Sequence, residues 1–386
     1  MVTYCKAKKE DMEDIIDFIN YVFSQGHRPH DFKALLPKLY GGEADSAGYH
    51  FLVKEKDKIK ALVGAFPTSY EVGEKTLKAC GIGMVSVHPY ARSKGYMKGL
   101  MHAVVDDARA QGYVFAFLGG QRQRYEYFGF EPAETRLNFT LTATNLHHTV
   151  KRDALLELTL VPLEGEALRD QAFALYQAQA FRAVRQKVDF LTVLGSWSGK
   201  AFAFLHEGTF AGYASLRDGG IVQELMLSRA GLYPGAMTSL MRMTGGDTLY
   251  LSASPYEHDK VNYLTETAEA VSCSTGESLH VFNWQEMLEA FLRLKAQKEP
   301  LAPGALTLSV SGKTFCITVE KDTLSVSEST AKADISLPDL KAVSLIFSFS
   351  GSYLKEYYAS GLSEEKARLV RSWFPMTLFL SPCDGC

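Results

Sequence analysis

The sequence predicts a protein of mixed α/β and α+β class, with two larger α/β units followed by a small α+β domain. Apolar residues recur at helical spacing in some segments and alternate with polar residues in others. The chain of 386 residues is long enough for two or three domains. A proline-rich break at 299–304 precedes a last group of short alternating strands. We therefore expect domains at 1–150, 151–298 and 299–386.

The first unit begins with two helices and continues as an antiparallel meander. Acidic residues crowd the first turn of the first helix, as the helix dipole favours. A later strand, rich in aromatic residues, ends at a Gly-Gly pair, and a short helical segment leads to Gly129. The expected helices are 9–23, 31–39, 96–111 and 122–127, and the expected strands are 50–54, 59–71, a strand ending near 87, and 113–118.

The second unit repeats this order loosely, with no second glycine loop. We expect helices near 165–183 and at 234–243, with strands at 201–205, 209–216 and 248–253. The last unit is expected to hold strands at 306–310, 314–319, 323–326 and 376–380 and helices at 337–347 and 364–372.

Composition excludes several classes of protein. With 46% hydrophobic and 22% charged residues the chain is globular, and a net charge of −3 argues against a nucleic-acid binder with a dominant basic face. No apolar run approaches the roughly 20 residues of a membrane span, and no signal-peptide pattern is seen, so we expect a cytoplasmic protein that binds no membrane. The C-x-x-C of Cys383 and Cys386 lacks a redox context or a second ligand pair, so we interpret it as two ordinary thiols and expect no metal.

The segment from Val85 to Met97, which we call the cradle, is the central feature of the sequence. A strand ends, a loop carries Arg92 and Lys94, Gly95 stands at the turn, and a helix begins. Free backbone N–H groups and the dipole at a helix N-terminus favour an anion, and glycine allows close approach of the backbone. The ligand that this pattern predicts is a diphosphate. The alternative is an ordinary β-loop-α junction that happens to be basic.

This pattern resembles motif A of the GNAT acetyltransferases, Arg/Gln-x-x-Gly-x-Gly/Ala. Here it is Arg92-x-x-Gly95-x-Met97, so the last small residue is missing. The resemblance implies acetyl-CoA as cosubstrate. The cofactor-binding residues that we expect are Met84, Val85, Val87, Arg92, Ser93, Lys94, Gly95, Tyr96, Met97, Gly120 and Gln121.

A second segment narrows the resemblance. Tyr125 stands three residues before Phe128-Gly129-Phe130, just after the strand beside the cradle. With the three-part layout, the chain resembles the Eis-like (enhanced intracellular survival) acetyltransferases. These carry a GNAT domain, a degenerate GNAT-like domain and a sterol-carrier-like domain, and they form hexamers. The resemblance implies the same tandem mixed sheets and a homo-oligomer here.

Acetyl transfer to an amine needs a base for the amine, a donor for the oxyanion and an acid for the thiolate. The resemblance assigns the oxyanion to a backbone N–H near Met84 and Val85, and the thiolate to Tyr125 as general acid. Tyr127 competes for the acid role, and Tyr125 could instead be a packed aromatic residue.

The base that the resemblance implies is the C-terminal carboxylate, here on Cys386. The Eis-like proteins usually end in a bulky apolar residue, so Cys386 departs from their pattern. Burial would raise the pKa of a terminal carboxylate and make it a better base. A frayed terminus is the alternative, and Asp384 could instead contact a cationic acceptor.

The leading hypothesis is direct acetyl transfer to primary amines of a small polycationic acceptor, an aminoglycoside or polyamine-like molecule. The acceptor class comes from the resemblance alone. One alternative is a protein or peptide acetyltransferase acting on lysine or on an N-terminus. Another is a non-catalytic protein that binds CoA or lipid.

Overall fold

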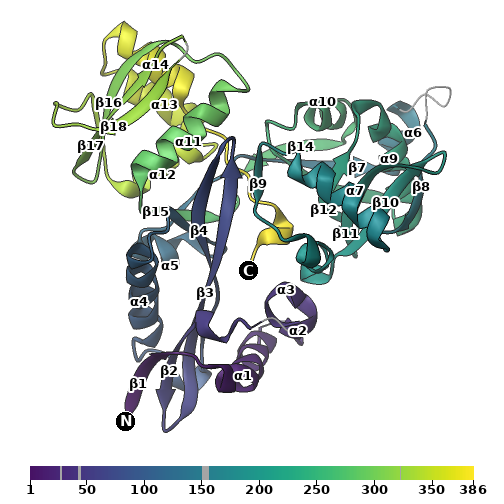
Figure 1. Ribbon diagram of the computed structural model, residues 1–386, viewed down its shortest axis with the longest axis horizontal. Coiled ribbons are helices and arrows are strands. Elements are labelled where there is room, and N and C mark those ends of the chain that lie inside the picture. The colour runs from purple at the N-terminus through teal and green to yellow at the C-terminus, as the bar shows by residue number, and fades with distance from the viewer. Residues whose placement is uncertain (27, 42–44, 150–155, 322) are drawn as a thin grey trace.

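The computed structural model describes residues 1–26, 28–41, 45–149, 156–321 and 323–386. The fold is mixed α/β, as the sequence predicted, with three sheets flanked by helices and arranged as three lobes (Figure 1). Within these residues no helix is long and apolar enough to cross a membrane.

The first sheet has eight strands in the order β1-β2-β3-β4-β5-β15-β6, with β9 paired to β3 beside this path. One face carries α4 (Tyr96–Ala110), and the other carries α1 (Met12–Ser24), each helix burying its apolar stripe. The strands are β1 (Val2–Lys6), β2 (His50–Glu55), β3 (Lys58–Val72), β4 (Lys75–Val87), β5 (Phe115–Leu118), β6 (Glu131–Pro132), β9 (Phe181–Ala183) and β15 (Ser278–Val281).

The second sheet has seven strands in the order β14-β7-β13-β12-β11-β10-β8. It repeats the first, because a parallel pair, β12 and β13, is joined through a helix, α9 (Tyr233–Thr244), as β4 and β5 are joined through α4. Its strands are β7 (Arg136–Thr142), β8 (Thr159–Pro162), β10 (Lys200–His206), β11 (Thr209–Arg217), β12 (Ile221–Leu227), β13 (Thr248–Ala253) and β14 (Ala270–Ser274).

The two sheets exchange strands, so neither is built from one continuous stretch of chain. Strand β7 comes early in the chain but pairs with β13 and β14 in the second sheet. Strand β15 comes late but pairs with β5 and β6 in the first. The range 1–150 therefore gives one strand, β7, to the second sheet, and the range 151–298 gives two strands, β9 and β15, to the first. The loop before β15 lies beside the end of β5.

The third sheet is small, in the order β18-β17-β16-β19, and packs on a shared core with the helix that precedes it. Its elements are β16 (Gly304–Val310), β17 (Lys313–Val319), β18 (Leu324–Glu328), β19 (Ile335–Leu337), α11 (Trp284–Ala296), α12 (Asp339–Phe347), α13 (Gly351–Ala359) and α14 (Glu364–Trp373). The remaining helices are α2 (Phe32–Leu35), α3 (Pro37–Tyr40), α5 (Arg122–Tyr125), α6 (Ala143–Thr149), α7 (Glu166–Gln177), α8 (Phe190–Leu194) and α10 (His258–Thr267).

Three predicted elements are corrected by the structure. The helix expected at 31–39 is broken at Leu36, because Pro37 disfavours helical geometry in the residue before it. The helix expected near 165–183 ends at Gln177, and the segment after it becomes β9.

The strand expected at 376–380 is not a strand. Its alternation is real, since Met376, Leu378 and Leu380 are buried, but its backbone bonds to scattered partners and not to a neighbouring strand. The Thr135 N–H donates to the Leu378 carbonyl, and the Met376 N–H donates to the Ile346 carbonyl. Beyond this segment the end of the chain lies between the three lobes, close to β3 and β4 (Figure 1).

Candidate active site

The site lies where two parallel strands of the first sheet separate. Strands β4 and β5 pair only from Ala79 with Phe115 to Gly81 with Phe117. From that point to its end at Val87, β4 has no strand partner on the β5 side within the part of the chain that the structure describes. Met84 adopts a positive φ of 55° and the β3–β4 register shifts beside it, so β4 bulges within this opening. The opening exposes backbone amides of the kind that can hold an oxyanion.

The predicted cradle follows the opening. Gly95 has a φ of 77° and caps α4, whose first N–H groups face a cavity of about 700 Å³. A Cβ on Gly95 would meet no atom within 4 Å, so the loop leaves space for a ligand at the helix start. This geometry fits the diphosphate of a CoA molecule. Seven of the expected residues line this cavity: Val85, Val87, Arg92, Ser93, Gly95, Tyr96 and Met97.

The other four expected cofactor-binding residues lie elsewhere. Lys94 points its ammonium at Glu55, 2.7 Å away, and Glu55 also accepts the Tyr96 hydroxyl. Met84 lines the second cavity described below. Gly120 and Gln121 line neither cavity, and Gly120 is instead packed under the Tyr125 ring.

A second cavity, of about 780 Å³, opens on the other side of the separated strands, and Tyr125 and Cys386 are among the residues that line it. We call this second cavity the chamber. Phe23, Val85 and Arg124 line both cavities, so the cradle and this chamber meet at the opening. Tyr125 is 6% exposed, and burial raises the pKa of its phenol against the opposing charge of Arg124, so the phenol stays protonated near neutral pH. Tyr127 is 62% exposed and lines neither cavity. Of the two tyrosines, only Tyr125 is placed to donate a proton here.

Three glycines lie beneath Cys386 and Glu277, and two of them, Gly83 and Gly119, line the second cavity. A Cβ on Gly83 would lie 2.9 Å from the carbon of the Cys386 terminal carboxylate. A Cβ on Gly81 would lie 2.8 Å from the Cys386 Sγ. One on Gly119 would lie 3.0 Å from an Oε of Glu277. We call Gly81, Gly83 and Gly119 the glycine floor. Cys386 and Glu277 thus occupy the space that side chains of β4 and of the residue after β5 would otherwise fill.

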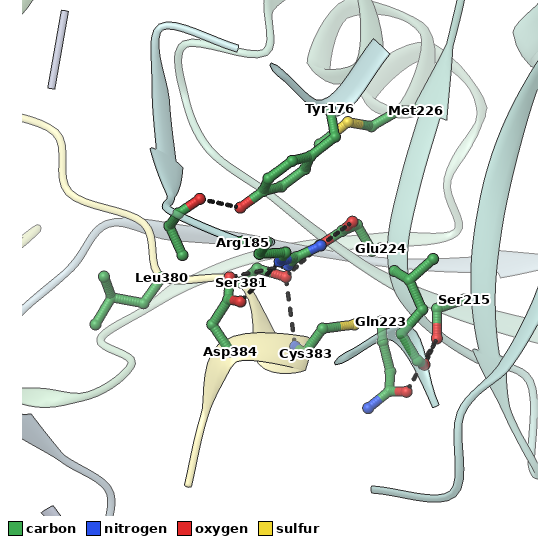
Figure 2. A network of polar contacts seen from close by, with 12 residues as sticks. Tyr176, Arg185, Ser215, Gln223, Glu224, Met226, Leu380, Ser381, Cys383 and Asp384 are labelled. Carbon is green, nitrogen blue, oxygen red and sulfur yellow. Dashed lines mark hydrogen bonds and ion pairs between the residues drawn. The ribbon is translucent and has the colours of Figure 1, made fainter. Parts of the chain in front are cut away.

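The last residues of the chain are held by a buried ion-pair network (Figure 2). Arg185 is 2% exposed at its side chain and donates to both Asp384, at 2.8 Å, and Glu224, at 2.7 Å. Figure 2 shows the guanidinium between Glu224 on one side and Ser381 and Asp384 on the other. The Ser381 hydroxyl also donates to Glu224. Asp384 therefore pairs with Arg185 and is not available to a cationic acceptor.

A second set of donors holds the tail from the N-terminal side. The Lys38 ammonium donates to the Cys383 and Gly385 carbonyls, both at 2.7 Å, and the Trp197 indole N–H donates to Gly385 at 3.3 Å. The Cys383 thiol is fully buried, and burial raises the pKa of the Cys386 thiol to about 12. Both cysteines are free and protonated, as ordinary thiols are. The tail is thus ordered, and a frayed end is excluded for these residues.

Glu277 is a site residue that the sequence analysis missed. It follows β14 and precedes β15, in a stretch with no recognisable motif, and it reaches the chamber because β15 pairs with β5. Burial, and then the neighbouring Glu134 carboxylate, raise the pKa of Glu277 to about 7. A carboxyl with this pKa can accept or donate a proton near neutral pH.

Comparison with known proteins agrees with this geometry. Residues 3–133 match the family described as an acetyltransferase (GNAT) domain. The chain is similar to a conserved protein of unknown function from Enterococcus faecalis V583, a probable N-acyltransferase, with a TM-score of 0.72, 16% identity and 99% of each chain covered. It is also similar to a GCN5-related N-acetyltransferase from Kribbella flavida (TM-score 0.69, 17% identity, 99% of each chain) and to Eis1 from Mycobacterium abscessus (TM-score 0.69, 14% identity, 99% of each chain).

At such identities these likenesses show the fold alone, and no curated relative matches the sequence. The family match covers the part of the chain that contains the cradle, the strand opening and Tyr125. Residues 3–133 are therefore a GNAT acetyltransferase domain, and the protein is an acetyltransferase.

Proposed function

We propose that the protein transfers an acetyl group from acetyl-CoA directly to a primary amine of a small polycationic acceptor. The observation that carries this proposal is that Tyr125 and Cys386 line one chamber, which meets the diphosphate cradle at the strand opening. In this arrangement the amine nitrogen attacks the thioester carbon, a C–N bond forms and the C–S bond breaks. Tyr125 gives its proton to the departing sulfur, and a backbone N–H near Met84 and Val85 holds the oxyanion.

The carboxylate that ends the chain at Cys386 is proposed to take a proton from the nitrogen. Its support is the position of Cys386 on the glycine floor and the network that fixes Asp384 and Gly385 before it. The Cys386 thiol, with its raised pKa, does not compete for this role. The sharpest test deletes Cys386 alone, because the Arg185–Asp384 pair and the buried Cys383 then remain.

We expect this deletion to lower kcat at least tenfold and to leave acetyl-CoA binding unchanged, as measured by calorimetry. A matched variant with two glycines added after Cys386 moves the carboxylate without removing a residue and should show the same loss. Full kcat in both variants would remove the carboxylate from the mechanism.

The acceptor class is supported by two carboxylates in the chamber, those of Glu277 and of the chain end, which attract amines. Arg124 and Arg217 line the same chamber, so the panel of acceptors must contain monoamines as well as aminoglycosides, polyamines and lysine peptides. The test is release of free thiol from acetyl-CoA with each amine. A mass shift on peptides and none on small amines would favour the alternative of a protein acetyltransferase.

The lipid-carrier alternative has less support. The aromatic stretch of the last domain, at 345–349, has Leu345, Ile346 and Phe347 fully buried in the core shared by α11 and the third sheet, and Phe349 half-buried. A sterol-carrier-like origin of this lobe and a hexameric assembly are proposed on the resemblance alone. Light scattering of the purified protein measures the number of subunits.

A further inference from the structure

We propose that Glu277 is a second proton acceptor in this site, which binds the ammonium of the acceptor and removes its first proton. The inference rests on the proposed function and adds a catalytic residue and a recognition element to it. It begins from stoichiometry. An ammonium that becomes an amide loses two protons from nitrogen, one before it can attack and one after, whereas Tyr125 supplies one proton to sulfur.

These two removals make different demands on a base. The first proton comes from an ordinary ammonium of pKa about 10.4, so an acceptor whose pKa lies near the working pH is favoured. The second comes from the far more acidic nitrogen of the tetrahedral adduct, for which a weak base is enough. A terminal carboxylate has a parent pKa of about 3.3–3.7 and suits the second step. The first step therefore needs another group.

The position of Glu277 meets this need. Its carboxylate lies against Gly119, directly after β5, while Cys386 lies against Gly81 and Gly83 on β4. Gly119 and Phe117 face the same side of β5, and Phe117 contacts the position where a Cβ of Gly81 would lie. The two carboxylates therefore stand on one face of the sheet, on the two sides of the strand opening. Among the described residues, no hydrogen bond or ion pair engages the Glu277 carboxylate oxygens.

The surroundings of Glu277 explain why it can change its protonation state. Its neighbour Glu134 is fully buried and accepts hydrogen bonds from Arg136 at 2.9 Å, from the Glu277 N–H at 2.7 Å and from the Leu380 N–H at 3.1 Å. Burial raises the pKa of Glu134, and the Arg136 guanidinium and these hydrogen bonds oppose that rise. The Glu134 carboxylate and, above all, burial raise the pKa of Glu277 in turn. The other charged or titratable groups that line the chamber are Arg124, Tyr125, Arg136, Arg217, His30 and Cys386.

All protons in this reaction are accounted for by the acceptor, the site residues and water. Glu277 takes one proton from the ammonium, and the free amine attacks the thioester carbon. The terminal carboxylate takes the second proton from nitrogen, while Tyr125 protonates the sulfur. Tyr125 is reprotonated by the terminal carboxylate or by solvent, and Glu277 returns its proton to water, so one proton is released for each amide formed.

The experiment compares the wild type with Glu277→Gln, which keeps size and removes the titration. Glu269→Gln is the matched control, because Glu269 is exposed just before β14 and does not line the chamber. We expect wild-type kcat/KM for the amine to fall tenfold per unit below a pH of about 7. Glu277→Gln should lose about 100-fold in kcat/KM at pH 7 and should lose this bend in the profile, with acetyl-CoA affinity unchanged. A Glu277→Gln enzyme within twofold of wild type, with the bend retained, would overturn the inference.

A binding measurement separates this inference from the proposed function. Calorimetry of spermine binding at pH 7, in two buffers of different ionisation enthalpy, counts the protons released. Wild type should release about half a proton, because the bound cation favours the ionised form of Glu277, and Glu277→Gln should release none. Proton release without turnover of any amine would uphold the role of Glu277 in binding and refute the acetyl transfer. Turnover with no change in either measurement would refute Glu277 and uphold the transfer.

Discussion

The Arg185 guanidinium and the Asp384 carboxylate lie 2.8 Å apart, and this pair joins the second lobe to the last residues of the chain. Arg185 also pairs with Glu224 and lies over the Tyr176 ring, 4.1 Å from its centroid. One buried cation thus serves two buried carboxylates (Figure 2). The arrangement makes the N-terminal chamber depend on residues about 200 positions away.

Because Arg185 pairs with two buried carboxylates, its loss should destabilise the protein more than the loss of either carboxylate. Arg185→Met leaves two buried carboxylates without a cation and should lower the free energy of unfolding by about 3–5 kcal/mol. Asp384→Asn leaves the Arg185–Glu224 pair intact and should cost only about 1–2 kcal/mol. Urea unfolding of both variants measures the difference. Equal losses would contradict the shared-cation arrangement.

Gly83→Ala tests the contact between the glycine floor and the end of the chain. The new Cβ would lie 2.9 Å from the Cys386 carbonyl carbon, so the terminal residue must move, whereas the cradle is not touched. We expect kcat to fall at least tenfold with acetyl-CoA affinity retained, as measured by steady-state kinetics and calorimetry. The control is the same substitution combined with deletion of Cys386, in which the alanine should add no further loss.

The sequence could predict what is local in this site. The cradle is local because Arg92, Gly95 and the start of α4 are joined by a single turn, and Tyr125 stands at a fixed distance from the Phe-Gly-Phe segment. Periodicity also located most of the elements that it assigned within a few residues, but no expected range covers α10, α11 or α13, or β7, β12 or β14. It failed at 376–380, where a segment with strand-like alternation is buried but, among the described residues, pairs with no strand.

What depends on long-range pairing could not be predicted. Nothing in the sequence near Glu277 indicates that β15 will pair with β5, because alternation defines a strand and not its partner. The exchange of β7 and β15 between the sheets, and the meeting of Asp384 with Arg185, arise from the same kind of distant contact. The Cys386 carboxylate was expected from the family resemblance, whereas Glu277 and the contacts that hold the tail are visible only in the folded chain.

Tyr125→Phe should lower kcat about 100-fold and leave acetyl-CoA affinity unchanged, because it removes one hydroxyl from the chamber and keeps the ring over Gly120. Tyr127→Phe is the matched control, since Tyr127 is exposed and lies outside both cavities. Stopped-flow measurement of thiol release gives both rates. A larger loss in Tyr127→Phe than in Tyr125→Phe would reverse the assignment of the acid.

The two basic residues of the cradle should differ in their effect on cosubstrate binding. Arg92 lines the cradle cavity, so Arg92→Ala should raise the KM for acetyl-CoA about tenfold. The Lys94 ammonium is engaged by Glu55, so Lys94→Ala should change that KM by less than threefold. Desulfo-CoA binding by calorimetry gives the same comparison without turnover. Equal effects would mean that Lys94 leaves Glu55 when the cosubstrate binds.

His50 should make the protein less stable in mild acid. It is fully buried and lies within hydrogen-bonding distance of the Ser46 carbonyl at Nδ1 and the Tyr40 hydroxyl at Nε2, both at 2.9 Å, and burial lowers its pKa to about 4. Above pH 6.5 both folded and unfolded states hold a neutral imidazole, so His50 adds no pH dependence there. Between pH 6.5 and 4 the unfolded state binds the extra proton, so stability falls as the pH falls, by about 2 kcal/mol at pH 5.

Other groups titrate in this range, so the measurement is the difference between wild type and His50→Gln. The variant should be less stable at pH 7, and its deficit should shrink by about 2 kcal/mol at pH 5. A deficit independent of pH would show that folding does not shift the pKa of His50.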